Sequence, residues 1–260
     1  MRRGKPATRE TVCVTGMSGR LGGILHRALA PDFELVALNR SAVPGVRTIR
    51  ADLRRPDSIG DALAGIDAIV HLAAYPFADD DAGEILPTNV LGTLHLLEAA
   101  RRAGVRRLVF GSSLSAIGGH RPAFLELCRG RRFLSAARKI AFLEAQESPR
   151  PDSLYGVSKV FGEALCRLYV DRHGFSCVCL RLAEVRPDDR PNPHDPHGAR
   201  ILCRHADFLA GVRAALARTR RPGFEIRTLI SDDFRDAEPR GVPRRRKPGA
   251  RVAGGAARRA

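Results

Sequence analysis

The run TVCVTGMSGRLG, at Thr11–Gly22, decides the fold class. Its first five residues are β-rich, three glycines follow at three-residue intervals, and an apolar-periodic segment continues to Leu29. A strand that turns through glycines into a helix is the order that a dinucleotide site needs, since glycines admit the turn and the approach of backbone to a pyrophosphate, and the helix N-terminus attracts its charge. The cofactor-binding residues predicted here are Gly16, Gly19, Arg20, Leu21 and Gly22.

Short apolar runs alternate with helical patterns along the rest of the chain. We expect strands at Phe33–Leu38, Val46–Ile49, Ala68–Leu72, Arg107–Phe110, Phe175–Leu182 and Phe224–Ile230. The expected helices are Pro56–Ala64, Ile85–Ala103, the segment that carries Tyr155 and Lys159, and His205–Leu216. This alternation predicts an α/β fold, a doubly wound parallel sheet of the Rossmann type, with a small C-terminal substrate lobe whose completeness stays open.

Composition divides the chain into three parts. Residues 1–10 form a basic N-terminal extension, and residues 11–234 are the expected NAD(P)-binding Rossmann-like domain. That domain has an atypical insertion at 120–148 and substrate-lobe elements at 183–220. Residues 235–260, rich in Arg, Pro, Gly and Ala, are expected to be a disordered tail. Whether the insertion and the tail are genuine features or signs of a degenerate gene copy stays open.

The formal net charge of +16 suggests nucleic acid as a partner, but the charge is unevenly placed. The segment Arg235–Ala260 alone carries eight arginines and one lysine against one aspartate and one glutamate. It has no aromatic residue on which a base could stack. We therefore expect a small-molecule substrate and no nucleic-acid partner; a homodimer stays open.

Cysteine and histidine usage indicates neither disulfides nor a metal. The six cysteines form no CxxC pair, and several lie inside apolar runs. His194 and His197 fall in the proline-rich stretch Val185–Gly198, which we expect to be a solvated loop. No run of about 18 apolar residues is present to span a bilayer. These features favour a cytoplasmic protein without a metal site.

The residues after the second strand bear on the cofactor. An NAD enzyme usually places Asp or Glu about twenty residues past the glycines, whereas an Arg nearby suits the 2′-phosphate of NADP. This chain has Asn39-Arg40 there, which favours NADP slightly and leaves NAD open. Asp52 is placed to reach the adenine. The remaining residues expected to border the cofactor are Leu53, Leu72, Ala73 and Ala74.

A second informative stretch is PDSLYGVSKVFGEALCRLY, at Pro151–Tyr169. Tyr155 and Lys159 are four residues apart and so share one face of a helix. A free tyrosine titrates near pH ~10, and an adjacent ammonium favours the phenolate. We therefore expect Lys159 to lower the pKa of Tyr155. Ser113 is predicted at the carboxyl end of a strand, where ligands bind in such sheets.

Together these motifs resemble the extended short-chain dehydrogenase/reductase family, in its NAD-dependent epimerase/dehydratase group, and within it the uronate-dehydrogenase-like NAD(P)-dependent oxidoreductases. The stretches that carry the resemblance are Thr15–Gly22, Glu84–Arg101, Pro151–Gly174 and Leu180–Pro191. The resemblance covers about residues 11–120 and 149–232.

The resemblance implies a role for each matching residue. Tyr155 would exchange a proton with the substrate hydroxyl, and Lys159 would hold the nicotinamide ribose. Ser113 would hydrogen-bond the reacting oxygen, and Asn89 would support a proton-relay water. Arg200 occupies the place of an arginine that grips the substrate carboxylate, a task that suits a bidentate guanidinium.

The chain also departs from the uronate enzymes. Leu114-Ser115 follows Ser113 where an Asn and a His are expected, and Glu184 replaces a small polar residue and would repel a uronate. The preferred interpretation is an NAD(P)-dependent oxidoreductase that transfers a hydride to or from a sugar-like alcohol or sugar acid. Two alternatives stay open: a nucleotide-sugar epimerase or dehydratase, and a non-catalytic NAD(P)-binding protein.

Overall fold

The computed structural model describes residues 9–76, 80–131, 133–146, 148–195 and 197–233. Most of the basic N-terminal extension and the predicted disordered tail lie outside the described residues. Seven strands form one sheet in which every pair of neighbours is parallel. They are β1 (Thr11–Thr15), β2 (Glu34–Asn39), β3 (Arg47–Arg50), β4 (Ala68–His71), β5 (Arg107–Ser113), β6 (Ser176–Leu182) and β7 (Gly223–Leu229).

The order of the strands across the sheet is β3-β2-β1-β4-β5-β6-β7. The chain therefore moves outward from β1 to one edge, returns, and then builds the other half from β4. In such a doubly wound sheet, the connections after β1 and β4 leave the sheet on opposite sides and open a crevice at the carboxyl ends of the strands. The predicted Rossmann-like α/β fold is confirmed.

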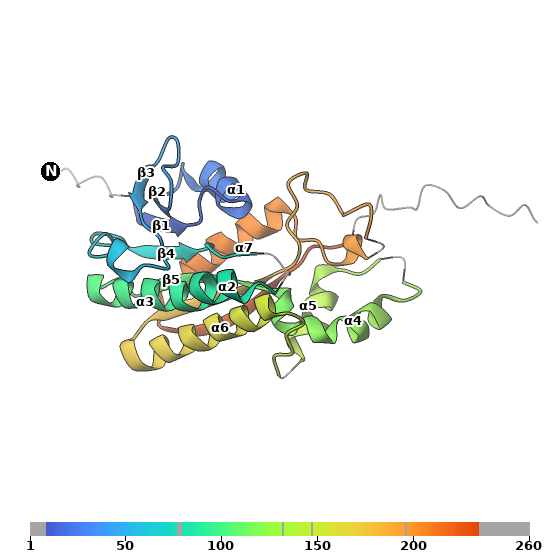
Figure 1. Cartoon of the computed structure of the whole chain (residues 1–260). Helices are drawn as coiled ribbons and strands as arrows, with labels where there is room; N and C mark the ends of the chain where they lie inside the picture. The colour runs from blue at the N-terminus through green and yellow to red at the C-terminus, as the bar shows by residue number, and fades with distance from the viewer. Residues whose placement is uncertain (1–8, 77–79, 132, 147, 196, 234–260) are drawn as a thin grey trace, which may run out of the picture.

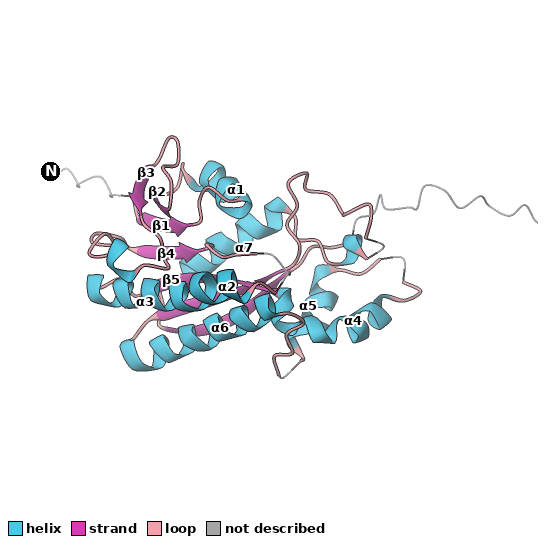
Figure 2. Cartoon of the chain, in the orientation of Figure 1, coloured by secondary structure: helices cyan, strands magenta, loops and turns pink. Residues whose placement is uncertain are grey.

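Helices cover both faces of the sheet (Figures 1 and 2). Val12 and Val14 of β1 belong to one buried apolar cluster, whereas Cys13 between them belongs to the other, as the two-residue repeat of a strand requires. The α-helices are α1 (Arg20–Leu29), α2 (Ala82–Ile85), α3 (Gly92–Ala103), α4 (Arg121–Cys128), α5 (Ala136–Glu144), α6 (Leu154–His173) and α7 (His205–Arg218).

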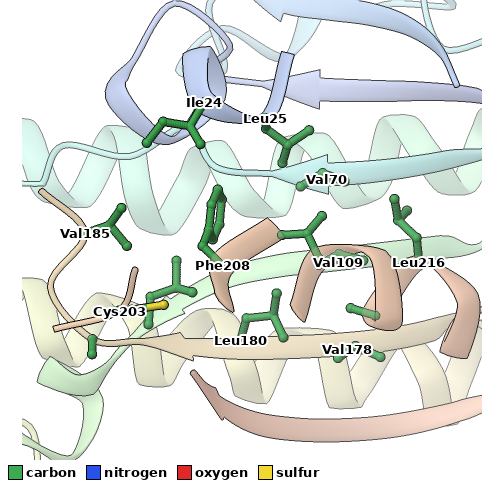
Figure 3. Close-up of a cluster of buried hydrophobic side chains, with 14 of the residues drawn as sticks. Ile24, Leu25, Val70, Val109, Val178, Leu180, Val185, Cys203, Phe208 and Leu216 are labelled. Carbon is green, nitrogen blue, oxygen red and sulfur yellow. The ribbon is translucent and has the colours of Figure 1, made fainter. Parts of the chain in front are cut away.

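The first cluster joins the sheet to α1 and α7 (Figure 3). Ile24 and Leu25 of α1 meet Phe208 and Leu216 of α7 over Val109 of β5. The second cluster joins the opposite face to α3 and α6, and its helical members include Leu96, Leu97, Leu165 and Cys166. All six cysteines are free and buried, as expected for residues inside apolar runs.

Two helix predictions need correction. The expected helix Pro56–Ala64 is only a 3₁₀ turn, Pro56–Ser58, because Gly60 adopts a left-handed φ of 44° and ends the helical path. The expected helix at Ile85–Ala103 begins earlier, with α2, and passes through the π-helical turn Leu86–Leu91 before α3. Pro87 lies in that turn and cannot donate a backbone hydrogen bond, which favours the wider spacing.

The insertion at 120–148 folds as α4 and α5 and joins the main core. Phe124 and Leu143 are each at most 5% exposed and belong to the same cluster as Phe208. Figure 1 shows α4 and α5 together at one end of the molecule, to the right of the labelled strands. A short 3₁₀ helix, Leu114–His120, links β5 to α4, and a further one, Gly198–Arg200, follows the proline-rich loop.

A buried ion pair ties the insertion to the end of the sheet. The Lys139 ammonium, on α5, is 0% exposed and lies 2.7 Å from an oxygen of Asp233 and 2.7 Å from the Ser231 carbonyl oxygen. The other Asp233 oxygen accepts a hydrogen bond from the backbone N–H of Leu134 at 2.6 Å. The segment that follows β7 is thereby fixed against both α5 and the loop before it.

Within the described ranges, no helix has the length and apolar character needed to cross a membrane. Nor do three or more His, Cys, Asp and Glu side chains gather in a metal-binding arrangement anywhere in the part of the chain that the structure describes. His194 and His197 lie in the proline-rich loop, where the backbone N–H of each is bonded to a nearby side chain, Asn192 and Asp195 respectively.

Candidate functional site

A cavity of about 950 Å³ opens at the carboxyl ends of β1, β2, β4 and β5. All fourteen residues predicted to bind a cofactor line it, although they come from segments as distant as α1 and α6. Those residues are Gly16, Gly19, Arg20, Leu21, Gly22, Asn39, Arg40, Asp52, Leu53, Leu72, Ala73, Ala74, Tyr155 and Lys159. Ser113 lines it as well.

The glycine turn between β1 and α1 has no room for side chains. Gly16 has a left-handed φ of 70°, and a Cβ there would lie 2.8 Å from the backbone of Ala73. A Cβ on Gly22 would lie 2.4 Å from the Gly16 carbonyl oxygen. No side chain caps the N-terminus of α1, so its first backbone N–H groups are left for an anion.

Two further glycines let α6 approach the sheet. A Cβ on Gly156 would lie 2.3 Å from the Ser115 carbonyl oxygen, and one on Gly162 would lie 2.2 Å from the Phe110 ring. Because α6 sits this close, the Lys159 ammonium reaches the Gly111 carbonyl oxygen at 2.8 Å. Both glycines are visible in the sequence, but only the packing of α6 on β5 reveals their purpose.

The pKa values of Tyr155 and Lys159 are set mainly by burial. Burial raises the pKa of Tyr155 to about 12, while a hydrogen bond with the Ser113 side chain acts in the opposite direction. Burial lowers the pKa of Lys159 to about 8, and the charge of Glu163 opposes that shift.

The expectation that Lys159 lowers the pKa of Tyr155 is therefore wrong for the protein without a ligand. The Lys159 ammonium lies over the face of the Tyr155 ring, 5.4 Å from its centroid, and is bonded to the Gly111 carbonyl. The ammonium therefore does not compensate for the loss of water around the phenolate oxygen. This desolvation disfavours the charged form of Tyr155 and so raises its pKa.

Glu163, which the sequence analysis did not predict as a site residue, lies one turn beyond Lys159 on α6. Its charge favours the protonated form of Lys159. Glu163 is 4% exposed and accepts two hydrogen bonds from Arg181 of β6, at 2.9 and 2.7 Å. It also accepts one from the Ser112 hydroxyl at 2.6 Å. The i, i+4 spacing of Lys159 and Glu163 was available in the sequence, but the pairing with β6 required the fold.

Asn89 and Arg200 are not among the residues that line the cavity. Asn89 is 3% exposed, and its amide bonds both backbone groups of Tyr75 and the Ser158 hydroxyl, so it fixes local structure. Arg200 forms an ion pair with Asp233 and donates to the Arg131 carbonyl oxygen at 2.5 Å. Both side chains are held by these partners rather than facing the cavity, although the Ser158 hydroxyl links Asn89 to the Tyr155 carbonyl oxygen.

The end of the cavity near β2 and β3 carries two arginines. Arg54 pairs with Asp52 at 2.7 Å, and this hydrogen bond is the main cause that lowers the pKa of Asp52. The charge of Arg40 lowers it further, and Arg40 itself is exposed. The sequence analysis missed Arg54, whose only signal was its position two residues after Asp52. Asn39 is 7% exposed, and its side-chain oxygen has no hydrogen-bond partner among the described residues.

A second cavity, of about 400 Å³, adjoins the first. Ser113, Leu182 and Ala183 line both cavities, so the two meet beside Ser113. The 3₁₀ helix Leu114–His120, helix α4 and the segment 184–201 supply most of the other walls. The site therefore has a long compartment against the glycine turn and a smaller one against the insertion.

The sequence of the chain matches the model of the NAD dependent epimerase/dehydratase family over residues 12–206. The chain belongs to this family. The seven-stranded parallel sheet and the glycine turn are consistent with this family. The predicted resemblance to the NAD-dependent epimerase/dehydratase group is confirmed.

Two curated relatives share about a third of their residues with this chain over the aligned regions. The L-arabinose 1-dehydrogenase (NAD(P)(+)) of Haloferax volcanii is 36% identical over 171 residues, which are 66% of this chain and 65% of the relative. A uronate dehydrogenase of Pseudomonas putida is 31% identical, over 73% of this chain and 64% of the relative. The chain thus spans slightly less than two thirds of the length of either relative.

Solved structures of family members agree with the fold. The uronate dehydrogenase of Agrobacterium tumefaciens superposes with a TM-score of 0.64 at 29% identity, covering 85% of this chain and 75% of the other. A variant of that enzyme complexed with NAD superposes equally well, with a TM-score of 0.64.

The lowered pKa of Lys159 predicts a pH-dependent stability for this family member. The ordinary lysine pKa is 10.5, so between about pH 8 and 10.5 the unfolded chain binds more protons than the folded one. Stability therefore rises with pH across this window, by up to about 3 kcal/mol. We expect Lys159→Met to lack this rise. Free energies of unfolding for both proteins at pH 7 and pH 10.5 measure it, and an identical change in the two proteins contradicts the assignment.

Proposed function

We propose that this protein is an NAD(P)-dependent oxidoreductase that acts on the alcohol carbon of a sugar-like substrate. The observation that carries the proposal is the meeting of Ser113, Tyr155 and Lys159 where the two cavities join. One compartment has the length and the glycine turn that a dinucleotide needs, and the other is left for the molecule to be oxidised or reduced.

The cofactor compartment fits a dinucleotide on its own geometry. Its glycines leave a cradle that a single Cβ would fill, and the uncapped N-terminus of α1 offers backbone N–H groups to the pyrophosphate. Asp52 and Leu53 would hold the adenosine end, and Lys159 the ribose near the reactive ring. When bound, NAD(P)⁺ supplies the hydride acceptor.

The protein's own residues manage the proton. As a substrate hydroxyl becomes a carbonyl, its proton passes to the Tyr155 oxygen, and in the reverse direction Tyr155 returns it. Ser113, which hydrogen-bonds Tyr155, orients the reacting oxygen. With a pKa of about 12 the free protein holds Tyr155 protonated at pH 7, ready to donate. Oxidation therefore calls for added positive charge, from the Lys159 ammonium and the oxidised cofactor, at a pH that does not exceed the Lys159 pKa of about 8.

The proposal is supported by relatives that are named as an L-arabinose 1-dehydrogenase (NAD(P)(+)), a uronate dehydrogenase and an NAD-dependent glucose-6-phosphate dehydrogenase. The test has two parts. Fluorescence titration with NADH and NADPH measures cofactor binding, and absorbance of the reduced cofactor reports oxidation of a panel of aldoses and sugar acids at mildly alkaline pH. Tight binding without turnover on any substrate supports the non-catalytic alternative instead.

We also propose that Arg40 favours NADP(H). Its exposed guanidinium lies beside the ribose end of the cavity, where a 2′-phosphate would gain a charge-assisted contact, and no carboxylate stands at Asn39 to repel it. Arg40→Ala should weaken NADPH about tenfold and NADH at most twofold, as titrations at constant salt would show. Arg55→Ala, on the same exposed surface but outside the cavity lining, is the matched control. If wild type prefers NADH and Arg40→Ala alters neither affinity, the assignment is wrong.

A further inference from the structure

The smaller cavity is the compartment that would receive the substrate, and residues of the insertion supply part of its walls. Ser113 belongs to both cavities, so a molecule in the smaller one reaches the group that hydrogen-bonds Tyr155. The apolar walls include Phe124 and Leu143, which come from the insertion. The insertion thus builds one side of the compartment, and residues 120–148 bear directly on what the compartment accepts.

The charged groups in this compartment are mostly carboxylates. Its lining includes Asp152, Glu184 and Asp195, against which Arg121 is the only lysine or arginine among the described lining residues. Arg121 is already paired with Asp195, at 3.4 Å. A carboxylate that entered here would find no arginine without a partner and would meet an excess of negative charge.

The two other carboxylates differ in their surroundings. Glu184 pairs with Arg186 at 3.3 Å, and that guanidinium also contacts Asp188 at 3.4 Å. Asp152 accepts a hydrogen bond from the Ser153 hydroxyl at 3.1 Å, and no described lysine or arginine forms an ion pair with it. Carboxylates of this kind accept hydrogen bonds from hydroxyl groups, and Asn192 can both donate and accept.

Building on the proposed oxidoreductase function, we propose that this compartment selects a neutral, unphosphorylated monosaccharide over a sugar acid or a nucleotide sugar. Sugar hydroxyls would donate to Asp152 and Glu184, and the C–H face of the ring would pack against Phe124 and Leu143. A uronate carboxylate or a diphosphate requires a cation that can pair with it, and the one lining arginine is committed to Asp195. A volume of about 400 Å³ also suits one sugar ring better than a nucleotide sugar.

The test compares sugars that differ only at C6, where one has a neutral hydroxymethyl group and the other a carboxylate. Glucose with glucuronate, and galactose with galacturonate, are titrated calorimetrically into the protein saturated with the reduced cofactor it binds better, so that binding is read without turnover. The neutral member of at least one pair should bind at least tenfold more tightly, because like-charge juxtaposition at a binding site is costly. UDP-glucose should bind more weakly than the better monosaccharide.

Three variants test which charged residues cause the preference for neutral sugars. Glu184→Gln keeps the shape and removes one negative charge, so the preference for the neutral sugar should fall at least threefold. Arg121→Gln leaves Asp195 without its partner, so the preference should grow. Glu126→Gln makes the same chemical change as the first variant on the exposed side of α4 and should leave the preference unchanged.

Three outcomes overturn the inference: equal or tighter binding of the uronates, an unchanged preference in Glu184→Gln, or no binding of any sugar to the cofactor-loaded protein. These results are separable from a failure of the proposed function. A protein that binds neutral sugars selectively but never reduces the cofactor supports the inference and contradicts the oxidoreductase activity.

Discussion

Tyr155→Phe should lower the rate of substrate oxidation by about 10²–10⁴-fold, the range that a general acid or base contributes. The change keeps the ring against the Lys159 ammonium and removes only the oxygen that exchanges the proton. Affinity for the cofactor should stay within about threefold of wild type, because the cradle at Gly16–Gly22 is untouched. Single-turnover rates with the best substrate of the panel measure the loss.

A matched control is available in the same helix. Tyr169 also lies on α6, and its hydroxyl is bonded to Glu98 rather than to any cavity residue. Tyr169→Phe makes the same chemical change away from the cavity and should retain turnover within about twofold. If Tyr155→Phe keeps more than about a tenth of the wild-type rate, Tyr155 is not the general base. In wild type, the oxidation rate should rise with pH only up to about pH 8, since the pKa of Tyr155 is raised to about 12 and the Lys159 ammonium loses its proton above a pKa of about 8.

Asp233→Ala should destabilise the fold by about 3–5 kcal/mol, which is the usual cost of leaving one partner of a buried ion pair without compensation. The Lys139 ammonium would stay fully buried, with the Ser231 carbonyl as its remaining hydrogen-bond acceptor. The Leu134 N–H and Arg200 would lose an acceptor as well. For a domain of this size the thermal midpoint should fall by roughly 6–20 °C.

Two variants give this prediction its controls. Asp171→Ala breaks the ion pair with Arg167 on the exposed face of α6, where both side chains are at least half exposed, and should cost less than about 1 kcal/mol. Lys139→Met in the Asp233→Ala background removes the unpaired charge and should recover part of the loss. A fall of no more than about 1 kcal/mol for Asp233→Ala would show that this network does not hold the insertion in place.

The sequence alone determined the fold class and most of the lining of the larger cavity. The glycine turn, the alternation of strands with helices and the spacing of Tyr155 and Lys159 are short-range patterns, and each follows from local backbone geometry. In a parallel sheet the carboxyl ends of the strands share one edge, so placing Asp52, Ala73 and Ser113 at strand ends also placed them in one cavity. Burial of the six cysteines followed likewise from their apolar surroundings.

Whether the insertion and the tail are genuine features or signs of a degenerate gene copy, and whether the protein forms a homodimer, stay open questions of the sequence. The tail and most of the basic N-terminal extension lie outside the described residues. The described surface carries exposed apolar side chains on α6, among them Val157, Phe161 and Leu168.

Only the tertiary structure decided the properties that depend on contacts between distant segments. The pKa of Tyr155 rises because desolvation by the assembled core outweighs the hydrogen bond with Ser113, while the nearby Lys159 ammonium is bonded to the Gly111 carbonyl. Arg200 pairs with Asp233 because the chain after β7 returns beside it, and no local pattern specifies that meeting. The charge of the smaller cavity arises in the same way, from carboxylates far apart in sequence, one just before α6 and two in the loop after β6, that the fold brings into one cavity. Helices, strands and turns can be predicted from the sequence because each depends on residues close together in the chain. Desolvation and ion pairing depend on contacts that exist only once the chain has folded.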